Sequence, residues 1–357
     1  MTHYERVRAT LDHQPVDRVS YDFSGEEVIW KQLEEYFQTE DRDTILDHLG
    51  VDRRTVGPKY IGPPLKTFED GSYEIIVSGG PRMKQYPSTN GMLVESIVHF
   101  PWANVETPED LEGLWGWDGK KEWWDFSYVK ESIQRLEERG KYWITAHGDP
   151  SGLQHISMWA GDEKFLMTLA LDEDLAVAMI EKHNEIRLWH ALKTLEAGEG
   201  KIHELNGGGD YGAQNSLLIS RDMFRRYFKP LYEKFYREIK KNFDVEIFFH
   251  SCGAIEPIIP DLIDVGVTIL DPIQTSAAGM DPRVLKAKYG DRLCFHGGLD
   301  VQSFLPFATP QQIREKVEEN TRILGKGGGY IAAPSHAVQP DTSLENVLAI
   351  YGLAKEK

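Results

Sequence analysis

The sequence predicts an α/β protein in which residues 1–357 form a single (β/α)8 barrel domain of the triosephosphate isomerase (TIM) type. Apolar runs of strand length alternate with amphipathic helical segments, and these runs number eight. Eight parallel strands joined by right-handed helical connections close into such a barrel. The rival is an open doubly wound sheet, which usually places a Gly-rich phosphate turn after an early strand. No G-x-G-x-x-G motif follows an early strand here.

The strands are justified by runs of apolar and β-branched residues that lie between turn and helix signals. Helical segments separate them, and in two of these the apolar residues recur at helical spacing, over 175–192 and 313–324. The run at 51–56 is charged and is the weakest of the set. The predicted strands are 19–23, 51–56, 142–147, 202–206, 245–250, 267–271, 293–297 and 329–333.

An insertion interrupts the alternation between the second and third strands, over residues 57–125. Three turn signals, Asp70-Gly71, Gly79-Gly80-Pro81 and Asn90-Gly91, separate extended runs and predict β-hairpins. Tryptophans follow at 102, 115, 117, 123 and 124. Such a cluster packs a subdomain onto its host or stacks on a flat ligand, and we favour packing on the barrel.

The composition restricts the partners and the compartment. The 57 acidic residues outnumber the 40 basic ones, and the net charge of −17 argues against binding to nucleic acid. Only two cysteines are present, and no apolar run has the length of a signal core or a membrane span. We therefore expect a cytoplasmic protein that does not contact a membrane. A homodimer is among the states that the sequence allows.

In a barrel of this type, functional groups stand at the carboxyl ends of the strands. Polar and titratable residues recur at these ends, and glycines follow several of them. This convergence indicates a site, although a solvent-exposed rim would be polar in any barrel. The rim residues that we assign to the site are Asp22, His147, Asp149, Glu204, Asp210, Tyr211, His250, Cys252, Asp271, Gln274, His296, Asp300, His336 and Gln339.

A candidate metal site begins with His250 and Cys252. Side chains alternate along a strand, so residues two positions apart project from one face and can approach one ion. Imidazole and thiolate suit zinc better than magnesium or calcium, which prefer oxygen. The simpler alternative is a buried Cys252 beside a hydrogen-bonded His250.

The third ligand is left open among three residues. His336 ends the last strand and can reach across the barrel mouth, which ranks it before His296 and Cys294. Cys294 shares a face with His296 but lies deeper along the same strand. Asp22, His147 and Glu204 could supply a weak fourth ligand.

Four segments resemble the uroporphyrinogen decarboxylase superfamily: FFHSCG (248–253), DPIQ (271–274), HGGLD (296–300) and APSHAVQ (333–339), with Asn346 behind the last of them. The resemblance covers nearly the whole chain and is weak over 57–130. It implies a TIM barrel, in agreement with the strand count.

Two branches of that superfamily differ at the end of the first strand. The decarboxylases bind the carboxylates of a tetrapyrrole with an arginine-rich segment, whereas this chain carries Asp22, Glu26 and Glu27 there. The other branch consists of zinc-dependent methyltransferases, whose His-x-Cys is matched by His250 and Cys252. Their third ligand is a cysteine, where this chain has His336.

The resemblance therefore implies a methyltransferase that moves a methyl group between a corrinoid (cobalamin) and a small thiol, ether or amine, with Zn²⁺ as cofactor. No Asp-x-His-x-x-Gly corrinoid motif occurs, so the corrinoid is expected on a separate protein. We assign proton handling or catalysis to Glu204, His147 and Asp210. The expected substrate-binding residues are Asp22, Asp149, Tyr211, Asp271, Gln274, His296, Asp300 and Gln339.

Two alternatives stay open. A metal-free decarboxylase would use Asp22 or Asp210 to stabilise a protonated intermediate formed from a porphyrinogen or another carboxylated substrate. A corrinoid-binding subunit that has lost turnover is the alternative outside catalysis.

Overall fold

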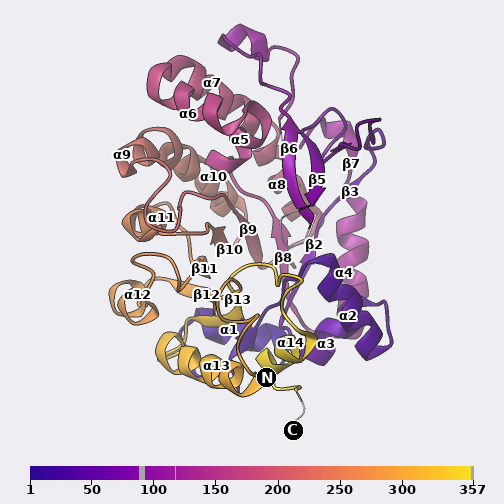
Figure 1. Ribbon diagram of the computed structural model, residues 1–357, viewed down its shortest axis with the longest axis vertical. Helices are drawn as coiled ribbons and strands as arrows, with labels where there is room; N and C mark the ends of the chain where they lie inside the picture. Colours follow the sequence, from indigo (N-terminus) through magenta and orange to yellow (C-terminus); the bar gives the residue numbers. More distant parts are fainter. Residues whose placement is uncertain (88–92, 117, 355–357) are drawn as a thin grey trace.

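Eight parallel strands form a nearly closed barrel in the computed structural model, which describes residues 1–87, 93–116 and 118–354 (Figure 1). Neighbouring strands pair in the order β1-β13-β12-β11-β10-β9-β8-β2. The predicted TIM barrel is therefore confirmed, including the weak second strand. The strands are β1 (Ser20–Tyr21), β2 (Arg53–Val56), β8 (Trp143–His147), β9 (Glu204–Gly208), β10 (Glu246–His250), β11 (Ile269–Ile273), β12 (Cys294–Leu299) and β13 (Tyr330–Pro334).

Helices lie between the strands and cover the outside of the barrel. Several begin at side-chain caps: Thr2 and Thr309 form capping boxes with Glu5 and Gln312. The α-helices are α1 (His3–Leu11), α2 (Glu27–Phe37), α3 (Arg42–Leu49), α4 (Ser127–Arg139), α5 (Leu153–Ala160), α6 (Asp162–Leu171), α7 (Glu173–Asn184), α8 (Arg187–Ala197), α9 (Arg221–Met223), α10 (Lys229–Asn242), α11 (Ile259–Asp264), α12 (Pro282–Tyr289), α13 (Pro310–Leu324) and α14 (Leu344–Ile350). None of the helices in the described part of the chain is long and apolar enough to cross a membrane.

Alternation along β10 separates two environments. Ile247 and Phe249 are fully buried in the main core between the wall and the helices. Phe248 belongs to a separate apolar cluster inside the barrel, together with Trp143 and Ile269. Phe248 therefore packs inside the barrel, and His250 lies at the carboxyl end of the same strand.

The seam between β1 and β2 is closed by Asp52. Its backbone N–H donates to the Tyr21 carbonyl at 3.0 Å, and its carboxylate accepts from the Tyr21 N–H at 2.9 Å. Arg6 and Arg18 donate to the same carboxylate at 2.6 and 3.0 Å, and His3 lies 2.7 Å from it. Because the Asp52 side chain is fully buried, these contacts join the amino-terminal segment to the two strands that flank the seam.

The insertion forms two small antiparallel sheets. One pairs β4 (Tyr73–Glu74), β5 (Arg82–Pro87) and β6 (Leu93–His99), and the other pairs β3 (Lys59–Tyr60) with β7 (Trp124–Asp125). The 3-10 helices Pro108–Leu111 and Lys121–Trp123 lie between them along the chain. The predicted hairpins are confirmed, whereas the Asn90-Gly91 turn and Trp117 lie outside the described residues.

The other tryptophans of the insertion mostly pack against protein. Trp102 is fully buried, with its ring centroid 5.7 Å from that of Trp159. The ring centroids of Trp115 and Trp123 lie 5.5 Å apart. Trp124 instead lines a cavity at the barrel mouth.

Asp261, in α11, makes stability sensitive to acid. Burial would raise the pKa of this carboxyl, but hydrogen bonds from Lys229, Arg221 and Arg225 outweigh it and lower the pKa to about 2. Its ordinary pKa of about 3.9 sets the unfolded reference, so the stabilisation is complete above about pH 4 and is lost as the pH falls towards 2.

We expect Asp261→Asn to lower the free energy of unfolding by about 2 kcal/mol at pH 6. The difference from wild type should shrink between pH 4 and pH 2, because the wild-type carboxylate is then protonated. Urea unfolding at several pH values measures this. A difference that stays constant over that range would show that the ion pairs do not cause it.

Candidate metal centre at the barrel mouth

The carboxyl end of β10 brings His250 and Cys252 together. The Cys252 sulfur lies 3.6 Å from His250 Nε2, and both side chains are partly accessible at the barrel mouth. The spacing expected from strand alternation is therefore realised in space. One nitrogen and one sulfur donor are available to a single ion.

Asp210 is the third donor that the structure brings to this pair. Its Oδ1 lies 3.6 Å from His250 Nε2 and accepts the backbone N–H of Cys252 at 2.8 Å. Ligand atoms of Asp210, His250 and Cys252 all lie within 4.8 Å of one another. The sequence suggested a catalytic role for Asp210 rather than that of a ligand.

Glycines explain how the loop after β9 comes so close to the loop after β10. A Cβ atom on Gly208 would lie 2.1 Å from the His250 carbonyl oxygen, and one on Gly212 would lie 2.6 Å from the Cys252 carbonyl oxygen. The Gly209 N–H also donates to the His250 carbonyl at 2.8 Å. Only glycine allows the two backbones this approach, which places Asp210 beside Cys252.

The other candidates for the third ligand lie elsewhere. The His336 side chain is exposed, and its Nδ1 atom lies 3.4 Å from the carbonyl oxygen of Ala337. Within the described residues, it does not belong to the group whose ligand atoms converge. Cys294 starts β12 and is buried at the opposite end of the barrel, with its sulfur 3.7 Å from the Leu11 carbonyl. His296 is buried between carboxylates. Of the three, His336 alone reaches the same mouth, in the wall of a pocket that Cys252 also lines.

Asp271 connects His250 to the barrel interior. One of its oxygens lies 2.5 Å from His250 Nδ1, and the other contacts His296 Nδ1. Desolvation would lower the pKa of His250, but the hydrogen bonds to Asp271 and Cys252 raise it well above its usual value. A carboxylate on Nδ1 orients the ring and directs Nε2 towards Cys252, as in metal sites where a second carboxylate positions a histidine ligand.

Beyond His296, ion pairs fill the barrel interior. His296 Nε2 lies 3.0 Å from an Asp22 oxygen, and Arg53 donates to both Asp22 and Glu204. The Trp143 indole donates to the other Glu204 oxygen at 2.8 Å. Desolvation opposes these charges, yet Asp271 and Asp22 raise the pKa of His296 to about 9, and Arg53 helps lower that of Asp22 to about 2. Glu204 is fully buried and does not reach the mouth.

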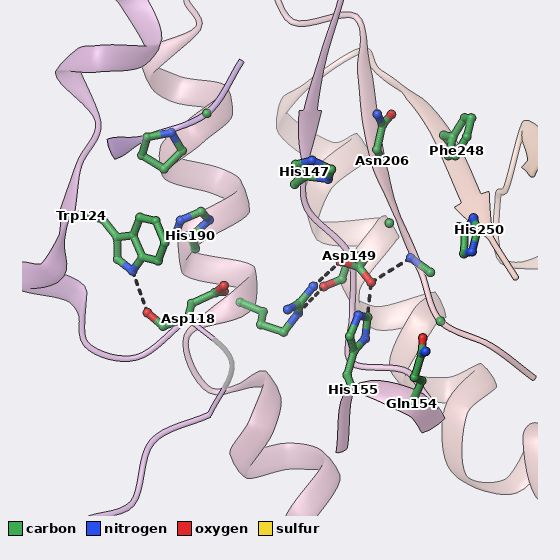
Figure 2. Close-up of a pocket in the computed structure, with 16 residues that line it drawn as sticks. Asp118, Trp124, His147, Asp149, Gln154, His155, His190, Asn206, Phe248 and His250 are labelled. Atoms are coloured by element: carbon green, nitrogen blue, oxygen red, sulfur yellow. Dashed lines mark hydrogen bonds and ion pairs between the residues drawn. The ribbon is translucent and has the colours of Figure 1, made fainter. Parts of the chain in front are cut away.

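Two cavities border the residues of the candidate metal centre. The first, of about 600 Å³, has His250 in its wall, with His147, Asp149 and Asn206 (Figure 2). The second, of about 350 Å³, has Cys252 in its wall, with Gln274, His336 and Gln339. Both volumes lie in the range of small-molecule sites. The candidate metal centre can therefore be approached from two sides.

Several predicted substrate residues have other partners. Tyr211 is fully buried, and its hydroxyl pairs with that of Tyr232 at 2.7 Å. Asp300 accepts the N–H groups of Gln302 and Ser303 at 3.1 Å and so caps the turn after β12. Gln274 accepts the Gly253 N–H at 2.7 Å and thereby supports the loop that carries Cys252.

Some residues of the site were not expected from the sequence. Arg53 is the central cation of the interior, but the charged run at 51–56 gave no indication of it. Asp118, Trp124, His155 and Arg187 line the first cavity and come from the insertion or from helical regions. Because the sequence analysis considered the carboxyl ends of predicted strands, it did not identify these residues.

Fold and site together define a parallel α/β barrel with a candidate soft-metal centre at the carboxyl ends of its strands. The chain belongs to the uroporphyrinogen decarboxylase (URO-D) family, which matches residues 102–357. This confirms the resemblance carried by the segments around His250 and His336.

Individual relatives match either a shorter part of the chain or nearly all of it at lower sequence identity. Two methylcobamide:CoM methyltransferases MtaA, from Methanosarcina barkeri and its strain Fusaro / DSM 804, are each 25% identical over 142 residues. This match covers 39% of the chain and 38% of the length of each relative. The structure of a methyltransferase from Methanosarcina mazei aligns with a TM-score of 0.67 and 19% identity, over 99% of this chain and 98% of that one, and supports the fold.

Proposed function

We propose that this protein is a zinc-dependent methyltransferase that moves a methyl group between a corrinoid on a separate protein and a small thiol, ether or amine. The observation that carries the proposal is the convergence of Asp210, His250 and Cys252 between two cavities. The partial similarity to the MtaA proteins supports the reaction class and the corrinoid partner.

The donor set fits zinc. One imidazole, one thiolate and one carboxylate are all ligands that zinc accepts, and three protein ligands leave a position for a substrate atom. When bound there, zinc would act as a Lewis acid that makes a thiol acidic or weakens the bond between a methyl group and its heteroatom.

The protein's own residues would prepare this site. Asp271 holds the His250 ring through Nδ1 and leaves Nε2 for the ion. Asp210 is fixed by the Cys252 N–H, and the Gly253 N–H is held by Gln274. His147, in the wall of the first cavity, is placed to exchange a proton with a bound substrate.

The decarboxylase alternative is less well supported. A decarboxylase of this kind needs Asp22 or Asp210 free to face a protonated intermediate. Asp22 is engaged by Arg53 and His296. Two buried guanidinium groups are paired with carboxylates: Arg53 with Glu204 in the barrel interior, and Arg187 with Asp149 in the wall of the first cavity. Few positive charges are left for a substrate with many carboxylates.

An anaerobic assay tests the function. The zinc-loaded protein is mixed with methylcobalamin and a panel of thiols, and the loss of the methyl-cobalt absorption is followed beside metal quantification. The reverse reaction is tested with methylated ethers and amines as methyl donors and reduced cobalamin as the acceptor. A cobalamin spectrum that stays unchanged with every compound in both directions would contradict the proposal, and full activity without zinc would favour metal-free chemistry.

The third ligand can be tested separately by substitution. We expect Asp210→Ala to weaken zinc binding by about 100-fold, because it removes one of three donors, whereas His336→Ala should change it by less than about threefold. Competition with a chromogenic chelator measures both. The opposite ranking would assign the third position to His336.

A further inference from the structure

The first cavity is built by the insertion and the barrel together. Trp124 and Asp118 come from the insertion, whereas His147, Asn206 and His250 come from strands (Figure 2). Figure 2 shows Asp118 and Trp124 on one side of this chamber and His250 on the other. A ligand that fills the chamber can therefore contact the insertion at one end and the candidate metal centre at the other.

The guanidinium in the chamber wall is balanced by a carboxylate. Arg187 donates through Nε to the Asp149 backbone carbonyl at 2.8 Å and pairs through Nη2 with the Asp149 carboxylate. The second Asp149 oxygen accepts the Gly208 N–H at 2.8 Å. This pair contributes no net charge.

The imidazoles of the chamber add little positive charge. Enclosure by protein lowers the pKa of His190, and it lowers that of His155 to about 4, whereas His147 is exposed. Near neutral pH the His155 and His190 rings are uncharged and can offer only hydrogen bonds and ring faces. His250 contacts the Asp271 carboxylate through Nδ1 at 2.5 Å.

Asp118 carries the one carboxylate in the described wall of the chamber that is not paired with a cation. The residue is only 9% exposed, and within the described residues its carboxylate makes no hydrogen bond or ion pair. The Trp124 indole N–H donates to the Asp118 backbone carbonyl at 2.6 Å and fixes the residue at the chamber wall (Figure 2). The Asp118 charge acts on His190 and Arg187, raising the pKa of each against the effect of burial. Two carboxylates therefore face one guanidinium, which leaves one negative charge.

We propose that Asp118 and Trp124 form a subsite for a methylated ammonium group, so that the small substrate of this chamber is an organic cation. The Asp118 carboxylate receives no hydrogen bond from the residues that the structure describes, and it lies beside an indole ring. This arrangement suits a cation that has no N–H groups of its own, because the face of an indole ring attracts a cation. An anion would face the unbalanced Asp118 and would be repelled. The inference rests on the proposed function only in placing the reacting end of the substrate at Asp210, His250 and Cys252.

Binding of choline and of its neutral isostere, 3,3-dimethylbutan-1-ol, to the full-length protein tests the subsite. The two molecules have nearly the same shape and differ in one positive charge. By isothermal titration calorimetry we expect choline to bind at least about tenfold more tightly than the alcohol to the wild-type protein. Because this comparison uses unaltered protein, it does not depend on the folding of a variant.

Two variants locate the charge effect. Asp118→Asn should weaken choline binding about tenfold and leave binding of the alcohol unchanged, because it removes the charge and keeps the shape. Glu122→Gln is the matched control: it removes the same charge from an exposed residue of the insertion and should leave both affinities unchanged.

Equal affinity of the wild-type protein for choline and the alcohol, or no binding of choline, would overturn the inference. So would a loss of choline binding in Glu122→Gln equal to that in Asp118→Asn. These measurements need neither zinc nor a corrinoid. A protein that binds choline through Asp118 but transfers no methyl group would therefore contradict the proposed function alone.

Discussion

Alanine in place of Cys252 is expected to abolish both metal binding and methyl transfer. The change removes the thiolate and leaves Asp210 and His250, which makes a two-ligand site too weak to hold zinc at ordinary concentrations. Zinc content after dialysis should fall from about one ion per chain to below about 0.1, and the transfer rate should fall by at least about 10³-fold. Substitution with cobalt gives a second readout, because a cobalt-thiolate charge-transfer band should be present in the wild-type protein and absent in the variant.

Cys294→Ala is the matched control for this prediction. Cys294 is the second cysteine of the chain, and it lies buried at the opposite end of the barrel beside the Leu11 carbonyl. The control should retain zinc and the cobalt band. Stoichiometric zinc in Cys252→Ala would show that the metal is bound elsewhere.

Asp52→Ala should have the largest effect on stability. Asp52 is fully buried, and its removal leaves the buried Arg6 and the partly buried Arg18 without their common carboxylate at the β1–β2 seam. Breaking a buried ion pair by removing one partner costs about 3–5 kcal/mol. Urea unfolding followed by circular dichroism should show a loss of this size in the free energy of unfolding.

Asp17→Ala provides the comparison. Asp17 also pairs with Arg6, at 2.7 Å, but its side chain is 42% exposed. Exposed pairs contribute about 0–1 kcal/mol, so this variant should remain close to wild type. Equal destabilisation by the two substitutions would mean that burial at the seam does not determine the effect.

The sequence was sufficient for the barrel because strand formation is a local property of apolar runs. All eight strands form where predicted, and three of them, β9, β11 and β12, extend two residues further than expected, to Gly208, Ile273 and Leu299. The run at 51–56 appeared weak because Arg53 faces an interior filled with carboxylates rather than an apolar core. A charged strand of this kind satisfies its charges only through distant residues, which local patterns do not reveal.

The site was predicted where strand alternation determines it and not where loops do. His250 and Cys252 follow from a two-residue spacing on one strand. The place of Asp210 beside them depends on glycines that let two loops touch, and the distance of His336 from them depends on the course of the loop after β13. Asp118 comes from the insertion, where the resemblance was weak, so no motif pointed to it.

The two cavities that border His250 and Cys252 have a consequence for the order of substrate binding and product release. Since His250 lies in the wall of one and Cys252 in the wall of the other, two reactants can occupy the protein at the same time without competing for space. Steady-state rates measured while both concentrations vary should then give intersecting double-reciprocal lines. Parallel lines would instead require the first product to leave before the second reactant enters.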